Sequence, residues 1–343
     1  MKKNWMEFSS NEVMAWLLEP DEENAPVRFL TLRDLLERDV IEPELKNARA
    51  FMMAHGPIPE ILSNQHKDGY WDRQDTIYYT KYRGTSWQII LLAQMGADKS
   101  NEQISKGCEF LLGHAIGDHG GFSMNGRQSG AANCLQGNLA AALLDLGYKE
   151  DLRVMKAIEW MARSVTGDGF NLTKKENHGM RYLRSGISGP GFLCSANDHQ
   201  PCAWGAVKVA LAFSKIPDNL RTQQINNAIS SCIDFLVSVN PATADYPHPY
   251  GKNPSTSWFK IGFPVFYVTD VLQILEALVA LGLIGDPRLQ NAVELVLEKR
   301  DKNLRWPMEY TYNGKTWVDI EEKGKPSKWV TFRALKMLKG YFS

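Results

Sequence analysis

Two kinds of apolar segment alternate along the chain. The first kind is apolar around most of its circumference, which is typical of a helix buried on both sides. The second kind has apolar residues at spacings of three and four and a charged opposite face, which is typical of a helix with one side in water. The first kind occurs at 86–98, 134–151, 202–218, 270–286 and 327–342, and the second at 101–115, 151–165, 222–239 and 287–301.

This alternation predicts a ring of helix pairs, with the buried helices inside and the amphipathic helices outside. Further helices are predicted before the first pair, at 12–19, 26–40 and 42–56. An open stack of helix pairs is the alternative, but it needs polar capping repeats at both ends. The last predicted helix keeps an apolar face to its end, which favours closure. We therefore expect one all-α domain over residues 1–343, an α/α toroid with little β structure.

A short polar turn that ends in an aromatic residue recurs between the predicted helices. It reads QHKDGYW at 65–71, GDHGGF ending at Phe122, TGDGF ending at Phe170, and DKNLRW ending at Trp306. The first three endpoints are roughly 50 residues apart, a spacing typical of stacked supersecondary units. The turn therefore marks the boundary between one helix pair and the next.

The first of these turns, Gln65-x-x-x-Gly69-x-Trp71, resembles the repeat motif of squalene and oxidosqualene cyclases. The helix-pair period resembles the α/α toroid that these terpene cyclases share with protein prenyltransferase β subunits. The resemblance implies a central cavity, lined by aromatic and apolar side chains, that holds an isoprenoid or another lipophilic small molecule. The sequence departs from the superfamily in having neither the Asp-x-Asp-Asp acid motif nor the Asp-Asp-x-x-Asp magnesium motif, because it contains no Asp-Asp pair.

Aromatic residues gather between the predicted helices and at their starts. Trp87 and Trp204 lie in the first turns of inner helices, while Trp258 and Tyr267 precede a third. Aromatic faces attract cations, which suits a cavity that handles carbocations. We expect these four residues to bind the substrate, although ordinary packing is the alternative for any single ring.

Three carboxylates are candidates for proton transfer. Glu276 lies within the apolar run of an inner helix, where a cavity-facing carboxylate would be desolvated and suited to general acid catalysis. If it faces a neighbouring helix instead, it is a paired structural charge. Asp198 and Asp270 lie near predicted helix starts, where capping of free backbone N–H groups is the alternative role.

Four soft or borderline ligands suggest a zinc site. Cys194, His199 and Cys202 form a Cys-x4-His-x2-Cys group, and Cys134 occupies the position in the preceding inner helix that matches Cys202. Four such ligands suit tetrahedral zinc, and three would leave an open catalytic position. Protein prenyltransferases hold zinc at the same rim with a different ligand set. The alternative is that Cys134 and Cys202 are small buried residues where helices crowd.

The composition of the chain limits which classes of binding partner are expected. Lys plus Arg and Asp plus Glu each total 39, so no net charge attracts nucleic acid. No stretch approaches the roughly 18 apolar residues of a membrane span. Five cysteines favour reduced thiols or metal ligands over disulfides. We expect a cytoplasmic protein without nucleic-acid partners or transmembrane segments.

Two function classes remain open. The first is an enzyme that acts on an isoprenoid or similar lipophilic substrate inside the toroid. The second is a non-catalytic module that binds a lipophilic ligand or a peptide, with any zinc serving a structural role. Similarity of fold cannot separate the two classes. An unpaired carboxylate in a deep cavity would favour the enzyme, and a ring filled by its own side chains would favour the module.

Overall fold

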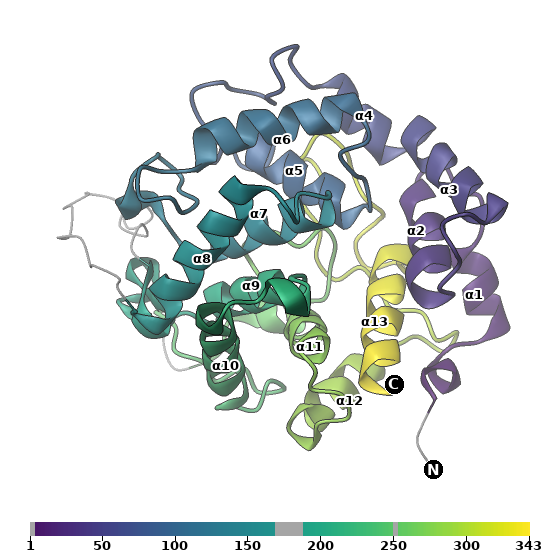
Figure 1. Cartoon of the computed structure of the whole chain (residues 1–343). Coiled ribbons are helices and arrows are strands. Elements are labelled where there is room, and N and C mark those ends of the chain that lie inside the picture. The colour runs from purple at the N-terminus through teal and green to yellow at the C-terminus, as the bar shows by residue number, and fades with distance from the viewer. Residues whose placement is uncertain (1–3, 169–187, 250–252) are drawn as a thin grey trace.

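The protein is described by a computed structural model that covers residues 4–168, 188–249 and 253–343. The long helices of these ranges fall into an inner and an outer set (Figure 1). The inner helices are α2 (Ala25–Leu30), α5 (Thr85–Gln94), α7 (Asn133–Asp145), α9 (Ala203–Ser214), α11 (Val271–Ala280) and α13 (Lys328–Tyr341). The outer helices are α1 (Asn11–Leu17), α3 (Pro43–Ala54), α6 (Glu102–Ala115), α8 (Leu152–Thr166), α10 (Gln223–Val237) and α12 (Gln290–Glu298), and α4 (Pro57–Ser63) follows α3.

The inner helices contact one another in chain order from α5 through α7, α9 and α11 to α13, and α13 contacts α2. The turn after α5 completes the circle, because Gly96 lies against Phe29 and Leu30 of α2. Near the two ends of the chain, Phe8 stacks on Phe342 with ring centroids 4.9 Å apart. The fold is therefore a closed α/α toroid, as the alternation of helix types predicts.

Burial explains the two helix types. In α5 every residue from Thr85 to Ala93 is buried, since outer and inner neighbours cover both of its sides. In α8 the buried residues return at helical spacing, while Leu152 at its start is exposed. The predicted helix at 26–40 is α2 followed by a π-helical turn at Thr31–Leu35.

Small residues set the separation of the inner helices where α7 meets α9. A Cβ added at Gly137 would overlap the backbone of Lys208. One added at Gly205 would crowd the Cβ of Asn133. Glycine at these two positions therefore lets the N-terminal halves of the two inner helices approach closely.

Strand content is small in the described residues. Three two-residue strands, β1 (Ser188–Gly189), β2 (Leu193–Cys194) and β3 (Gln200–Pro201), pair antiparallel in that order just before α9. Of the helices that the structure describes, none combines the length and the apolarity needed to cross a bilayer. The prediction of a single domain stays a prediction.

The recurring aromatic turns in the described residues lead into the inner helices α5, α7 and α13. Gln65 bridges to Trp71 as an antiparallel pair, and Ile116 bridges to Phe122 in the same way. The Trp71 indole donates to the carbonyl of Ile61 at 2.8 Å, and its backbone N–H donates to the hydroxyl of Thr85 at the start of α5 at 3.1 Å. The turn is therefore a buried link between two helices.

The last copy of the turn repeats these contacts. The Trp306 indole donates to the carbonyl of Val296 at 2.7 Å, and its backbone N–H donates to the Thr331 hydroxyl of α13 at 3.0 Å. Phe170, the aromatic endpoint of a third copy, lies outside the described residues. The matching contacts of Trp71 and Trp306 explain why an aromatic residue stands at the end of each of these two turns.

We expect Trp71→Phe and Trp306→Phe each to lower the free energy of unfolding by about 1–3 kcal/mol. Each change removes an indole hydrogen bond and leaves space in a closely packed site. Urea denaturation of the variants measures the effect. Trp16→Phe, at a half-buried ring against Arg305, is the control, and an equal loss in all three variants would contradict a special role for the turns.

Candidate functional site

The four aromatic residues predicted to bind substrate lie in one continuous row, which we call the aromatic rim. The ring centroid of Tyr267 lies 6.1 Å from that of Trp87 and 6.3 Å from that of Trp204. Trp204 in turn lies 6.4 Å from Trp258. Trp87 and Trp258 are buried, whereas Trp204 and Tyr267 are half-buried. The aromatic rim thus joins a buried group of rings to a partly accessible surface.

Local structure positions these rings at the N-terminal ends of inner helices. Trp87 lies in the first turn of α5 and Trp204 in the first turn of α9. Trp258 lies in the short 3₁₀ helix η8 (Thr256–Phe259), and Tyr267 lies in the segment that leads into α11. Neighbouring inner helices start on the same side of a toroid, so residues distant in sequence meet there.

The sequence analysis missed Lys81, which adds a charge to the aromatic rim. Its Nζ lies 4.5 Å from the ring centroid of Tyr267, 4.8 Å from that of Tyr78 and 6.0 Å from that of Trp87. Partial burial lowers the pKa of Lys81. The signal was present in the segment TIYYTKYRGTSW, where a lysine stands among closely spaced aromatic residues.

A second aromatic group lies beneath the aromatic rim. Tyr82 stacks on Phe266 with centroids 5.1 Å apart and meets Tyr312 edge-on at 4.4 Å. A pocket next to this group is lined by Asp270, Tyr310 and Tyr312 among others, and its cavity volume is about 10 Å³. Small-molecule sites usually measure roughly 300–1,000 Å³, so this pocket is too small for a hydrocarbon ligand and has room for about one water molecule.

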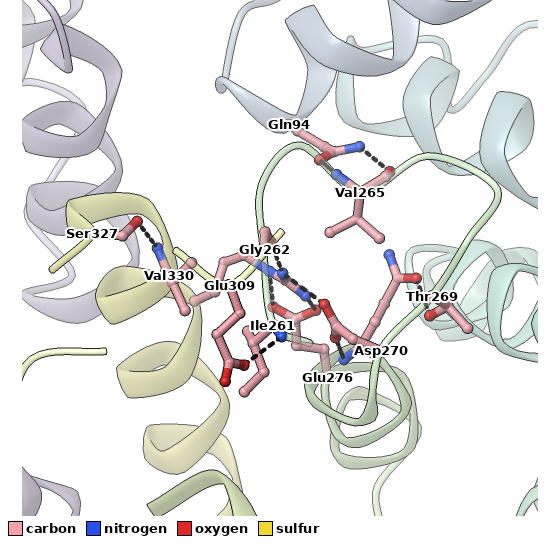
Figure 2. A network of polar contacts seen from close by, with 12 residues as sticks. Gln94, Ile261, Gly262, Val265, Thr269, Asp270, Glu276, Glu309, Ser327 and Val330 are labelled. Atoms are coloured by element: carbon pink, nitrogen blue, oxygen red, sulfur yellow. Dashed lines mark hydrogen bonds and ion pairs between the residues drawn. The ribbon is translucent and has the colours of Figure 1, made fainter. Parts of the chain in front are cut away.

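Glu276 and Asp270 meet at one guanidinium, that of Arg333 on α13. Arg333 donates to the two carboxylate oxygens of Glu276 at 3.0 and 2.7 Å, and to Oδ2 of Asp270 at 3.5 Å. It also donates to the carbonyl of Gly262 at 2.6 Å. Figure 2 shows Asp270, Glu276 and Gly262 converging in this network. Burial opposes the charge of Arg333, but the two carboxylates outweigh it and raise its pKa.

These contacts show where each of the predicted carboxylates lies, while their catalytic roles stay predictions. Glu276 is a paired charge that faces the neighbouring inner helix. Asp270 caps α11, because its Oδ1 accepts the backbone N–H of Gln273 at 2.8 Å. Asp198 differs from the expected cap: it is exposed, in a left-handed backbone conformation after the turn Ser195–Asn197, and Cys202 occupies the N-cap position of α9.

A fully buried lysine lies beside this network. The Nζ of Lys208, on α9, donates to Oε1 of Gln273, which also accepts the Thr269 hydroxyl at 2.6 Å. Burial lowers the pKa of Lys208 to about 7, although the charge of Asp270 acts in the opposite direction. The lysine therefore lies close to its titration point at neutral pH.

Three of the four predicted zinc ligands lie near one another. The Cys202 thiol donates to Cys194 and lowers the pKa of Cys194 to about 7, while burial raises the pKa of Cys134, which also feels the charge of Cys194, to about 11. His199 is exposed. Over the described ranges, no group of three or more His, Cys, Asp or Glu side chains is placed so that it could hold a metal ion. The four residues do not form a ligand set here, and zinc binding stays a prediction.

Comparison with known proteins bears on the fold. No protein-family model and no curated protein matches the sequence. An unsaturated glucuronyl hydrolase specific for heparin is 11% identical over 94% of this chain and 86% of its own, with a TM-score of 0.50. A family 105 glycoside hydrolase from C. acetobutylicum is 11% identical over 96% and 98%, with a TM-score of 0.49. The type II terpene cyclase MstE from Scytonema is 11% identical over 83% and 95%, with a TM-score of 0.32.

Identities this low describe architecture and leave chemistry open. The similarity to the glucuronyl hydrolase supports the α/α toroid. The carboxylates and rings described above therefore have to be interpreted from their own contacts. The chain is an α/α toroid of the broad architecture that the sequence predicts.

We expect Glu276→Gln to lower the free energy of unfolding by about 3 kcal/mol. Removing one partner of a largely buried ion pair is destabilising, and the Arg333 guanidinium would keep only its longer 3.5 Å contact with the carboxylate of Asp270. Glu298→Gln, on the exposed face of α12, should change stability by no more than about 0.5 kcal/mol. Urea denaturation of the two variants and the native protein tests this; equal stabilities would contradict the structural role of Glu276.

Lys208 should make stability depend on pH. Its pKa in the folded protein, about 7, lies below the ordinary value of 10.5. Between these values the unfolded state holds the proton and the folded state does not. The stability of the native protein relative to Lys208→Met should therefore rise with pH across that window, by up to about 1.4 kcal/mol per pH unit. Below pH 7 the full cost of burying the charge should be present.

Urea denaturation of both proteins from pH 7 to pH 10 measures this difference. Lys156→Met is the control, because Lys156 is exposed on α8. A stability difference between native protein and Lys208→Met that stays constant with pH would show that Lys208 titrates normally.

Proposed function

We propose that the protein binds a lipophilic small molecule of isoprenoid type at the aromatic rim. The observation that carries this proposal is the row of rings from Trp87 to Trp258, assembled from three separate parts of the chain. Trp204 and Tyr267 remain half-buried within it. Covering their exposed apolar surface with a hydrocarbon would be favourable.

The same site gives less support to acid-initiated cyclisation. Protonation of an alkene requires a strong and correctly placed acid. Glu276 and Asp270 are engaged with Arg333, and Asp198 is exposed on a turn. Binding of the ligand is therefore the first candidate function, and catalysis by a terpene cyclase-like or prenyltransferase-like enzyme is the second.

The centre of the ring also favours binding at the rim over a deep cavity. The segment at 261–268 is held across the ring by Gln94 of α5, which exchanges two hydrogen bonds with the backbone of Val265 at 2.7 and 2.9 Å (Figure 2). On the other side, the Arg333 guanidinium binds the carbonyl of Gly262. The protein's own backbone therefore occupies part of the space that the superfamily resemblance assigns to a ligand.

Isothermal titration with farnesol and geranylgeraniol tests the proposal. We expect binding to the native protein and at least about tenfold weaker binding to Trp204→Ala, because removal of a contacting ring costs on the order of 1.4 kcal/mol or more. Trp16→Ala, remote from the aromatic rim, should bind as the native protein does. Absence of binding by both alcohols, or equal affinity of the Trp204→Ala variant with an unchanged melting temperature, would refute the proposal.

A further inference from the structure

Lys81 is the one cation that contacts the rings of the aromatic rim within the described residues. Its ammonium faces Tyr78, Trp87 and Tyr267. The carboxylates that the structure describes pair with other cations, or lie apart from Lys81, and none forms an ion pair with it. The Lys81 ammonium is thus in contact with neutral rings, although an ammonium binds a carboxylate more strongly than it binds a ring.

We propose that Lys81 selects a lipophilic ligand that carries a single anionic head group, namely a carboxylate. The inference rests on the proposed function for the hydrocarbon part of the ligand and adds the chemistry of its head. One ammonium matches one negative charge. The neighbouring cation, Arg83, is already stacked on Trp317 at 4.9 Å.

The position of Lys81 suits this role. Part of the Lys81 side chain is exposed although its ammonium is partly buried, and Tyr79, two residues earlier, is 48% exposed, so a head group can approach the ammonium from solvent. Tyr267 touches both Lys81 and the half-buried Trp204. A carboxylate on Lys81 would therefore place the hydrocarbon of the same molecule along Tyr267 toward Trp204.

The same geometry disfavours a positively charged ligand or intermediate. The faces that attract cations in Tyr78, Trp87 and Tyr267 already hold an ammonium. A second cation on these faces would be repelled at short range. Lys81 thereby converts an aromatic cage suited to cations into a site for anions.

Three amphiphiles of equal chain length test the inference: decanoate, decanol and decyltrimethylammonium, each below its critical micelle concentration. By isothermal titration at pH 7.5, the native protein should bind decanoate at least tenfold more tightly than decanol and should bind the trimethylammonium least. Lys81→Met should lose that preference and gain affinity for the trimethylammonium, because the cage is vacated. Lys81→Arg should retain the preference for decanoate.

Lys260→Met is the matched control, since Lys260 lines the small pocket beside Tyr312. Its preference for decanoate should equal that of the native protein. Equal binding of decanoate and decanol to the native protein would overturn the role of Lys81 while leaving the proposed hydrocarbon site in place. A preference retained by Lys81→Met, or lost in Lys260→Met, would also overturn it. No binding of any of the three would refute both inferences.

Discussion

The Arg333 guanidinium connects three parts of the toroid that are separate from one another along the chain. It extends from α13 to Glu276 and Asp270 on α11 and to the carbonyl of Gly262 in the segment before that helix. A buried charge is tolerated only when it is paired and hydrogen-bonded. The positions of α11, α13 and the segment between η8 and α11 therefore depend on one another, and so does Tyr267, which that segment carries.

The architecture could be predicted from the sequence because it depends on local periodicity. The all-round apolar run that forms α5 and the one-sided run that forms α8 specify which helix is inside and which is outside. The aromatic row was also predictable in part, since Trp87 and Trp204 each lie in the first turn of an inner helix. In a repeating fold, residues at the starts of successive inner helices lie near one another in space.

The chemistry of the site depends on contacts that no local pattern reveals. Glu276 pairs with Arg333, 57 residues later in the chain, and its catalytic role stays a prediction. Asp198 lies in the loop of a short hairpin, between β2 and β3, and that pairing separates it from the start of α9. Lys81 was missed because its significance lies in the faces of three rings, only one of which is distant in sequence.

The stacking of Phe8 on Phe342 has a consequence for biosynthesis. Residues from the two ends of the described chain form one part of the wall, so the ring cannot close until the last inner helix has been made. Until then, the inner helices α11 and α2 lack their neighbour α13, and the apolar surface that α13 covers is exposed. Contacts so distant in sequence slow folding, and exposed apolar surface promotes aggregation. A nascent toroid of this kind is therefore prone to aggregation until α13 has been made.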